Sequence, residues 1–248
     1  MNPEIRVFET AEETAAVLAD DLVQIISGFG EDRTFTIAQS GGTTPRLLFQ
    51  ALAGRHRDSV DWRKVSFFWV DERCVPPDDP ESNYGMTLNT LLCKIDIPPE
   101  NIHRVMGEAE PDSEALRYSE IIEKTVPMRN GLPFFDVVLL GLGDDGHTAS
   151  IFPGNETLFS VRETCRIAIH PNTGQKRITI TGKVINNAGI VMFFVSGKNK
   201  ARIVGEIVGR EGPARYPADY VSPLAGRLLW YLDEDAASMI PGRKTDFV

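Results

Sequence analysis

The chain has 248 residues and a formal net charge of -9, with 26 lysines and arginines against 35 aspartates and glutamates. Its 42% of hydrophobic residues is typical of a globular protein, and the acidic balance argues against a nucleic-acid partner, which would need a broad basic face. We see neither a signal peptide nor an apolar stretch of membrane-spanning length, so we expect a cytoplasmic protein without a membrane partner. The three unpatterned cysteines, Cys74, Cys93 and Cys165, indicate neither a disulfide framework nor a zinc site.

The N-terminal part alternates strands and helices. A short strand is expected at 5–8, followed by a helix that begins with a capping pattern from Thr10 to Glu13 and ends at Gly28. The next strand, 34–38, runs into the loop Ser40–Pro45 and a second helix, for which Thr44 is suited to the cap and Pro45 to the first helical position.

The same alternation continues to the C-terminus. We expect strands at 65–70, 136–140, 177–181 and 190–195, helices near 86–94, 112–126, 183–188 and 200–208, irregular structure at 95–111, and a last edge strand at 230–232. No linker interrupts the pattern. The prediction is one α/β domain of residues 1–248, with a doubly wound, mostly parallel sheet and helices on both faces.

The catalytic loop is expected directly after the strand 136–140. That strand is an unbroken apolar run, as in a sheet covered on both faces, and glycines then turn the chain sharply. Asp144, Asp145 and His147 follow at the sheet edge where ligands of α/β proteins bind. The pattern favours His147 as a general base over a histidine that only stabilises the loop. No second nitrogen ligand stands at metal-binding spacing, so no metal is expected.

The loop Ser40–Pro45 has the chemistry of a phosphate cradle. Two glycines, hydroxyl groups and a helix N-terminus together favour an anion, although a tight strand-to-helix turn explains the pattern equally well. Ser40 also resembles a nucleophile elbow, but too little sheet precedes it for a serine triad. The glycine spacing after 141 mimics a dinucleotide fingerprint, but Asp144 and Asp145 would face the pyrophosphate, so no nicotinamide cofactor is expected.

Charged residues stand at several other strand ends. Asp71 follows the strand 65–70 and is interpreted as a site residue, with Glu72 as its solvated neighbour. Three cations at one sheet edge favour an anionic substrate; they are Arg73, Arg177 and Lys200. The other histidines are interpreted as surface or turn residues; they are His56, His103 and His170.

Taken together, the motifs resemble those of 6-phosphogluconolactonases over nearly the whole chain. The matching segments are 40–45, Asp71-Glu72-Arg73, Asn83-Tyr84-Gly85, 141–153, 176–181, 197–201 and 230–233. The resemblance implies hydrolysis of 6-phospho-D-glucono-1,5-lactone to 6-phosphogluconate in the oxidative pentose phosphate pathway. It implies a small-molecule sugar-phosphate lactone as the partner and no cofactor. We expect a monomer or weak homodimer.

The resemblance also suggests roles for single residues. His147 would activate water, with Asp145 or Asp71 orienting the ring, and amides near Gly143 would receive the oxyanion. The substrate-binding set would comprise Ser40, Gly41, Gly42, Thr43, Thr44, Arg73, Asn83, Gly143, Arg177 and Lys200.

Two alternatives remain open: a glucosamine-6-phosphate deaminase/isomerase, and a non-catalytic sugar-phosphate-binding regulator. The deaminase pattern has a glutamate shortly after the histidine, where this chain has Phe152. We expect Phe152 to form an apolar wall beside the loop.

Overall fold

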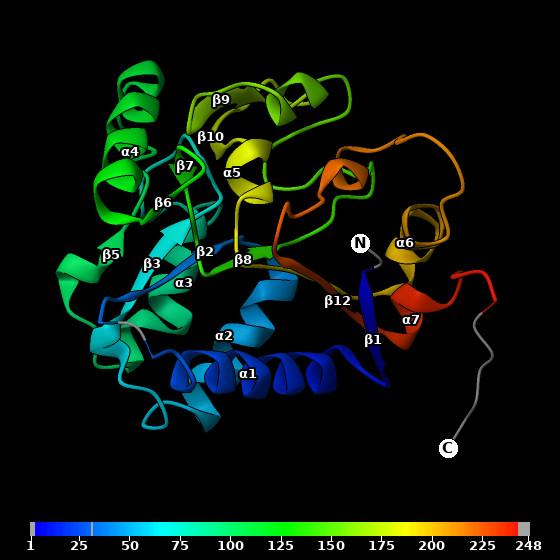
Figure 1. Cartoon of the computed structure of the whole chain (residues 1–248), viewed down its shortest axis with the longest axis horizontal. Coiled ribbons are helices and arrows are strands. Elements are labelled where there is room, and N and C mark those ends of the chain that lie inside the picture. The colour runs from blue at the N-terminus through cyan, green and yellow to red at the C-terminus, as the bar shows by residue number, and fades with distance from the viewer. Residues whose placement is uncertain (1–2, 31, 243–248) are drawn as a thin grey trace.

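A seven-stranded sheet forms the centre of the protein (Figure 1), in a computed structural model that describes residues 3–30 and 32–242. The strand order is β1-β12-β11-β8-β2-β3-β5, and every neighbouring pair runs parallel. The strands are β1 (Glu4–Phe8), β2 (Phe35–Gln39), β3 (Val65–Trp69), β5 (Ile102–His103), β8 (Val137–Leu140), β11 (Ile190–Val195) and β12 (Arg227–Asp233). The predicted α/β fold with a mostly parallel sheet is confirmed.

Helices cover both faces of this sheet. In Figure 1, α1, α2 and α3 lie below it, whereas α4 and α5 lie above it. Because both faces are covered, β2, β3 and β8 are buried at every position, as their apolar sequences predict. The helices are α1 (Ala11–Ser27), α2 (Thr43–Arg55), α3 (Asn83–Thr90), α4 (Pro111–Thr125), α5 (Gly182–Asn186), α6 (Ala201–Val208) and α7 (Glu234–Ala237). Within the described residues, none of the helices is long and apolar enough to cross a membrane.

A second, antiparallel sheet of order β4-β10-β9 lies above the main one in Figure 1. Its strands are β4 (Asp71–Arg73), β9 (Cys165–Ile169) and β10 (Lys176–Ile180). The predicted strand 177–181 therefore belongs to this sheet, and β9 was not predicted, because its sequence mixes exposed polar and apolar residues. A two-stranded ribbon joins β6 (Met128–Arg129) to β7 (Leu132–Pro133).

Three local predictions need correction. The C-terminal strand β12 is not an edge strand but lies between β1 and β11, which explains why Trp230, Tyr231 and Leu232 are buried. The segment 95–111, predicted to be irregular, contributes β5 at one edge. Thr10 caps α1 as predicted, but the Glu13 side chain accepts from the Glu9 amide rather than from that of Thr10.

The neighbouring strands β2 and β8 form the switch point of the topology. From β2 the sheet grows towards β3 and β5, and from β8 it grows in the opposite direction towards β11 and β12. The loops that follow β2 and β8 therefore diverge and leave a crevice at the carboxyl ends of the two strands, where α/β sheets bind ligands.

One partly buried ion pair, with the Arg33 side chain 24% and the Asp136 side chain 9% exposed, fixes the opposite end of the same two strands. The Asp136 carboxylate, just before β8, accepts hydrogen bonds of 2.8 and 2.7 Å from the Arg33 guanidinium. It also accepts from the amide and hydroxyl of Thr36 in β2, at 2.8 and 2.9 Å. The register of β2 against β8 thus depends on a carboxylate satisfied by four donors.

Asp136→Ala is expected to lower the free energy of unfolding by about 3 kcal/mol, because the guanidinium and the Thr36 amide lose their common buried acceptor. Urea denaturation monitored by circular dichroism measures the change. The control is Asp58→Ala, since the Asp58 side chain is 95% exposed, and it should change stability by less than about 0.5 kcal/mol. A loss of under about 1 kcal/mol for Asp136→Ala would show that the pair behaves like a surface salt bridge.

Candidate active site

A cleft of about 280 Å³ opens at the switch point, at the carboxyl ends of the central strands. Four loops line it, following β2, β3, β8 and β11, and β10 adds one side chain. Its volume suits a small molecule. Every residue that the sequence suggested for the site, apart from Asp145, lines this cleft: Ser40, Gly41, Gly42, Thr43, Thr44, Asp71, Arg73, Asn83, Gly143, His147, Arg177 and Lys200.

The loop after β2 has a different helix cap from the predicted one. Helix α2 begins at Thr43 with Gly42 as its N-cap, at φ 108°, so neither Thr44 at the cap nor Pro45 at the first helical position is correct. A residue with a side chain is strained at this φ, which explains the glycine. The first amides of α2 have no intrahelical acceptor, so the amides of Thr43 and Thr44 suit an anion.

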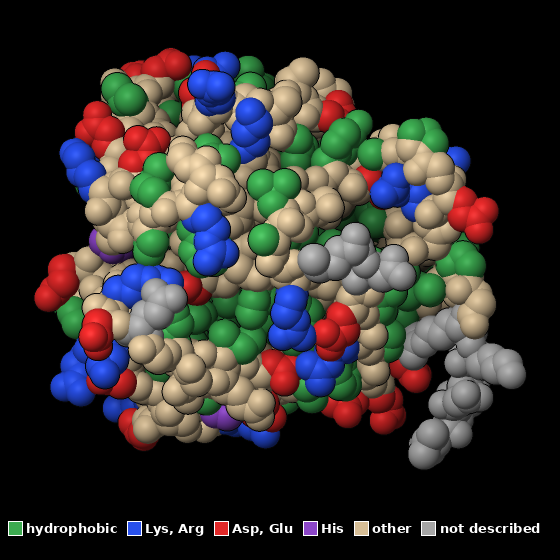
Figure 2. Space-filling model, viewed as in Figure 1, with side chains coloured by type: hydrophobic (Ala, Val, Ile, Leu, Met, Phe, Trp, Pro, Cys, Tyr) green, Lys and Arg blue, Asp and Glu red, His purple; other side chains and the backbone are tan. Residues whose placement is uncertain are grey.

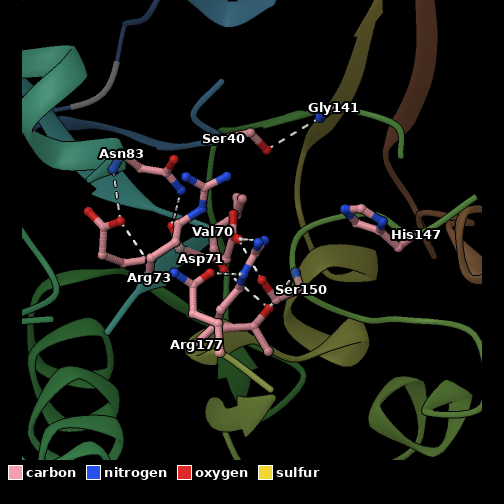
Figure 3. Close-up of polar contacts among 12 residues, drawn as sticks. Ser40, Val70, Asp71, Arg73, Asn83, Gly141, His147, Ser150 and Arg177 are labelled. Atoms are coloured by element: carbon pink, nitrogen blue, oxygen red, sulfur yellow. Dashed lines mark hydrogen bonds and ion pairs between the residues drawn. The ribbon is translucent and has the colours of Figure 1, made fainter. Parts of the chain in front are cut away.

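Ser40 is a structural residue in this loop. Its hydroxyl donates to the Leu139 carbonyl at 3.1 Å and accepts from the Gly141 amide at 3.3 Å (Figure 3). The side chain is buried, and its partners are backbone groups rather than a base. This arrangement joins the loops after β2 and β8 and agrees with the rejection of a serine nucleophile.

His147 and Asp145 form a hydrogen-bonded pair. The Nδ1 atom of His147 lies 2.6 Å from Oδ1 of Asp145, and the His147 amide donates to the same oxygen at 3.1 Å. Because the carboxylate accepts, Nδ1 is the donor, and in the neutral ring Nε2 is then the acceptor. Burial alone would raise the pKa of Asp145, but the hydrogen bonds and charge of His147 lower it to about 2.

The surroundings of His147 hold its ring in place. A Cβ atom on Gly143 would come within 2.1 Å of Nδ1, so only glycine permits this approach. The Gly143 amide donates to the His147 carbonyl at 2.9 Å, and it is therefore occupied rather than free to receive an oxyanion. On another side, the buried Phe152 ring lies 4.8 Å from the imidazole, centroid to centroid. The predicted apolar wall is confirmed.

Asp71 contacts other groups. Its Oδ2 accepts from the Ser150 hydroxyl at 2.6 Å and lies 3.9 Å from a guanidinium nitrogen of Arg177. Figure 3 shows Asp71 with Arg73 and Arg177 on one side of the cleft and His147 on the other. In this geometry Asp145, and not Asp71, is the carboxylate on the imidazole.

Three cationic side chains reach the cleft from separate elements. Arg73 lies on β4, Arg177 on β10, and Lys200 just before α6. The Nε atom of Arg73 is buried without a hydrogen-bond partner among the described residues. Lys200 forms an ion pair with Asp144, which joins the loop after β11 to the loop after β8. Such a cleft can attract and hold a dianion.

Several other sequence interpretations change. Glu72 is not solvated but buried, and it accepts hydrogen bonds around the start of α3. His103 is half-buried and stacks on Phe68 with ring centroids 4.4 Å apart, so it is not a surface residue. His170 is a turn residue, as predicted, because its Nδ1 accepts from the amides of Asn172 and Thr173.

Sequence reasoning missed two residues that support the loop of His147. Tyr216 packs against Gly146, and the neighbouring Ala218 amide donates to the Gly146 carbonyl at 3.1 Å. Ser150 anchors the end of the loop to Asp71. Tyr216 lies about seventy residues further along the chain in an irregular segment, and no local pattern marks it.

Within the ranges 3–30 and 32–242, no group of three or more His, Cys, Asp and Glu side chains is placed to hold a metal ion.

Comparisons with known proteins agree with this geometry. The model of the family described as "Glucosamine-6-phosphate isomerases/6-phosphogluconolactonase" matches residues 9–230. A 6-phosphogluconolactonase of Treponema pallidum is 43% identical over 81% of this chain and 82% of its own length. One of Haemophilus influenzae is 41% identical over 94% of this chain and 98% of its own length.

A solved structure agrees over the same length. The crystal structure of a protein named devB superposes with a TM-score of 0.90 at 40% identity, covering 96% of this chain and 99% of the other. Because the family model covers most of the chain, including all four cleft loops, this chain belongs to the glucosamine-6-phosphate isomerase/6-phosphogluconolactonase family.

Proposed function

We infer that this chain is a 6-phosphogluconolactonase, which hydrolyses 6-phospho-D-glucono-1,5-lactone to 6-phosphogluconate in the oxidative pentose phosphate pathway. The observation that carries the inference is the pair His147–Asp145, facing a cleft with three cations. The two relatives described above, which bear this name and cover most of the chain, support the same activity.

In the proposed complex, the 6-phosphate lies at the start of α2. The amides of the Gly41–Thr44 loop would donate to its oxygens, while Arg177 and Lys200 would neutralise its charge, with Arg73 adding to the clamp. On binding, the phosphate would compete with Asp144 for Lys200. The lactone ring would then extend towards His147.

Hydrolysis would proceed by general-base catalysis. Nε2 of His147 takes a proton from a water molecule, whose oxygen forms a bond to the lactone carbonyl carbon. Asp145 stabilises the resulting imidazolium through Nδ1. The carbonyl oxygen takes up the negative charge of the tetrahedral intermediate. The bond from the carbonyl carbon to the ring oxygen then breaks, and His147 returns its proton to that oxygen.

A deaminase/isomerase needs a further acid/base group beside the histidine. Phe152 occupies the position of the deaminase glutamate and contacts the imidazole with an apolar ring, so it cannot relay a proton. A non-catalytic regulator would need only the anion clamp, and it would give no reason for the hydrogen-bonded imidazole–carboxylate pair of His147 and Asp145.

We further propose that residues 1–248 form one domain, because strands near both ends of the described chain pair in one sheet. We propose a cytoplasmic location and a monomer or weak homodimer. On the face shown in Figure 2, acidic and basic side chains are mixed, and this face has no extended basic patch that would suit nucleic acid.

The function is tested by supplying freshly made 6-phosphogluconolactone and measuring acid release above the spontaneous rate, alongside ammonia release from glucosamine 6-phosphate. We expect rapid acid release and no ammonia. Ammonia production at a rate comparable to lactone hydrolysis would instead identify a deaminase. Binding of 6-phosphogluconate without either reaction would identify a regulator.

His147→Ala is expected to lower kcat by about 10²-fold or more, because general-base catalysis contributes roughly 10²–10⁴-fold. The Kd for 6-phosphogluconate should change little, since the anion contacts remain. The control is His56→Ala, whose ring pairs with Asp20 away from the cleft and which should keep full activity. If His147→Ala retains activity within a few-fold of wild type, another group activates the water.

Asp145→Asn should lower kcat at least about tenfold, because the neutral amide stabilises the imidazolium less well. The pKa of Asp145 in the folded protein is about 2, below the ordinary value of 3.8. Its carboxylate is therefore charged at neutral pH, and the charge is lost only as the pH falls through this range. The Asp145 carboxyl carbon should thus keep the NMR chemical shift of an ionised carboxylate from about pH 8 to about pH 5. The shift of a protonated carboxyl group within this interval would contradict the assignment.

Lys200→Ala and Arg177→Ala should each raise the Kd for 6-phosphogluconate at least about tenfold, because a charge-assisted hydrogen bond contributes roughly 1.5–3 kcal/mol. Calorimetric titration measures this change. Lys124→Ala, which removes an exposed lysine of α4, is the matched control and should leave Kd unchanged. Should neither cleft variant weaken binding, the phosphate binds elsewhere.

A further inference from the structure

Glu72 stands next to Asp71 on β4, and its carboxylate points into the protein. Only 2% of the residue is exposed. One oxygen accepts from the amides of Arg73 and Asn83, both at 2.8 Å. The other oxygen accepts from the Tyr84 amide at 2.7 Å and from the Ser82 hydroxyl at 3.2 Å. The four donors are all uncharged, so Glu72 is not one half of an ion pair.

These donors belong to the two segments that carry cleft residues. Asn83 and Tyr84 open helix α3, whose first amides have no intrahelical acceptors. A carboxylate at this helix end satisfies two of them and interacts favourably with the helix dipole. Burial raises the pKa of Glu72, and the backbone hydrogen bonds oppose that effect. The donors around Glu72 therefore require an acceptor with two oxygens, although burial removes water from that carboxylate.

Asn83 connects the start of α3 to the loop Ser40–Pro45. Its side-chain amide donates to the Asp71 carbonyl at 2.9 Å. Its carbonyl group lies against Gly41 so closely that a Cβ there would come within 1.9 Å of Oδ1. The start of α3 is thus packed closely against Gly41, and Glu72 binds the amide of Asn83 at this end of the helix (Figure 3).

The position of Arg73 also depends on the Glu72 carboxylate. Its amide is bound to Glu72, and its guanidinium reaches the Glu81 carbonyl, just before α3. The backbone from Arg73 to Glu81 is thus joined at one end to the Glu72 carboxylate and at the other to the Arg73 guanidinium. A shift of α3 would therefore displace both ends of Arg73.

We propose that Glu72 is a positioning residue for anion binding: it holds Arg73 and Asn83 against the loop of Gly41 without touching the substrate. The inference rests on the proposed function, because it concerns the same cleft. Glu72 is not one of the proposed reacting groups, because His147 and Asp145 lie on the loop after β8. Loss of Glu72 should thus impair binding far more than the chemical step.

The test compares Glu72→Gln with Glu114→Gln. Glu114 is a buried carboxylate of α4 that also accepts from a backbone amide, that of Met106 at 2.7 Å, but it does not line the cleft. Glu72→Gln places an NH₂ group against an amide donor and should raise KM for the lactone and Kd for 6-phosphogluconate at least about tenfold, with kcat within about threefold of wild type. Glu114→Gln should lose thermal stability but keep both constants.

Ser82→Ala provides a milder variant if Glu72→Gln does not fold. It removes the longest of the four contacts to Glu72 and should raise Kd about two- to fivefold with kcat unchanged. The proposal is overturned if the folded Glu72→Gln protein, or Ser82→Ala in its place, binds as tightly as wild type. An equal rise in KM for Glu114→Gln also overturns it, because general destabilisation would then explain the effect.

Titration with inorganic phosphate keeps this test independent of the assigned activity. If wild type failed to hydrolyse the lactone, the proposed function would fail. The phosphate affinities of wild type, Glu72→Gln and Glu114→Gln would still decide the role of Glu72: selective weakening in Glu72→Gln supports it, and equal affinities refute it.

Discussion

The site depends on the parallel pairing of β2 with β8, where the order of the sheet reverses. This pairing is held at one end by the Asp136 carboxylate and at the other by the Ser40 hydroxyl, which bridges Leu139 and Gly141. Between these two points the strands are buried on both faces. The loop Ser40–Pro45 and the loop of His147 consequently leave neighbouring strands of the sheet, and their separation is set by the pairing of β2 with β8 and by the Ser40 hydroxyl.

Sequence patterns predicted what is encoded locally. The apolar run of β8 followed by glycines located the loop of His147, and the sequence separation of two residues between Asp145 and His147 already allowed their hydrogen bond. The choice between Asp145 and Asp71 was not encoded in this way. It required knowing that Ser150 and Arg177 satisfy Asp71 from other elements.

Contacts between distant segments explain the errors. Glu72 looks like a surface residue in a charged tripeptide, and its burial follows only from the packing of α3, which begins eleven residues later. Strand β12 looked like an edge because it is last in the chain, yet β1 pairs on its outer side. Strand β9 has no distinct pattern of its own and exists because β10 folds back on it. In each case a tertiary partner outweighs local propensity.

The protein has a net charge of -9 and would still have to attract a dianion. The positions of the charged side chains in and beside the cleft explain how it can do so. Mobile ions screen exposed carboxylates beyond about 8 Å at physiological ionic strength, whereas cations within a cleft act at contact distance. Three carboxylates in or beside the cleft loops have other hydrogen-bond partners: Asp71 is bound to Ser150, Asp145 to His147, and Glu72 to the start of α3. Asp71 also lies 3.9 Å from Arg177, and Asp144 pairs with Lys200. The Asp144 side chain is 71% exposed, so water can replace the lysine as its partner when an anion arrives. The acidic residues around the cleft therefore leave part of its positive charge available to an anion.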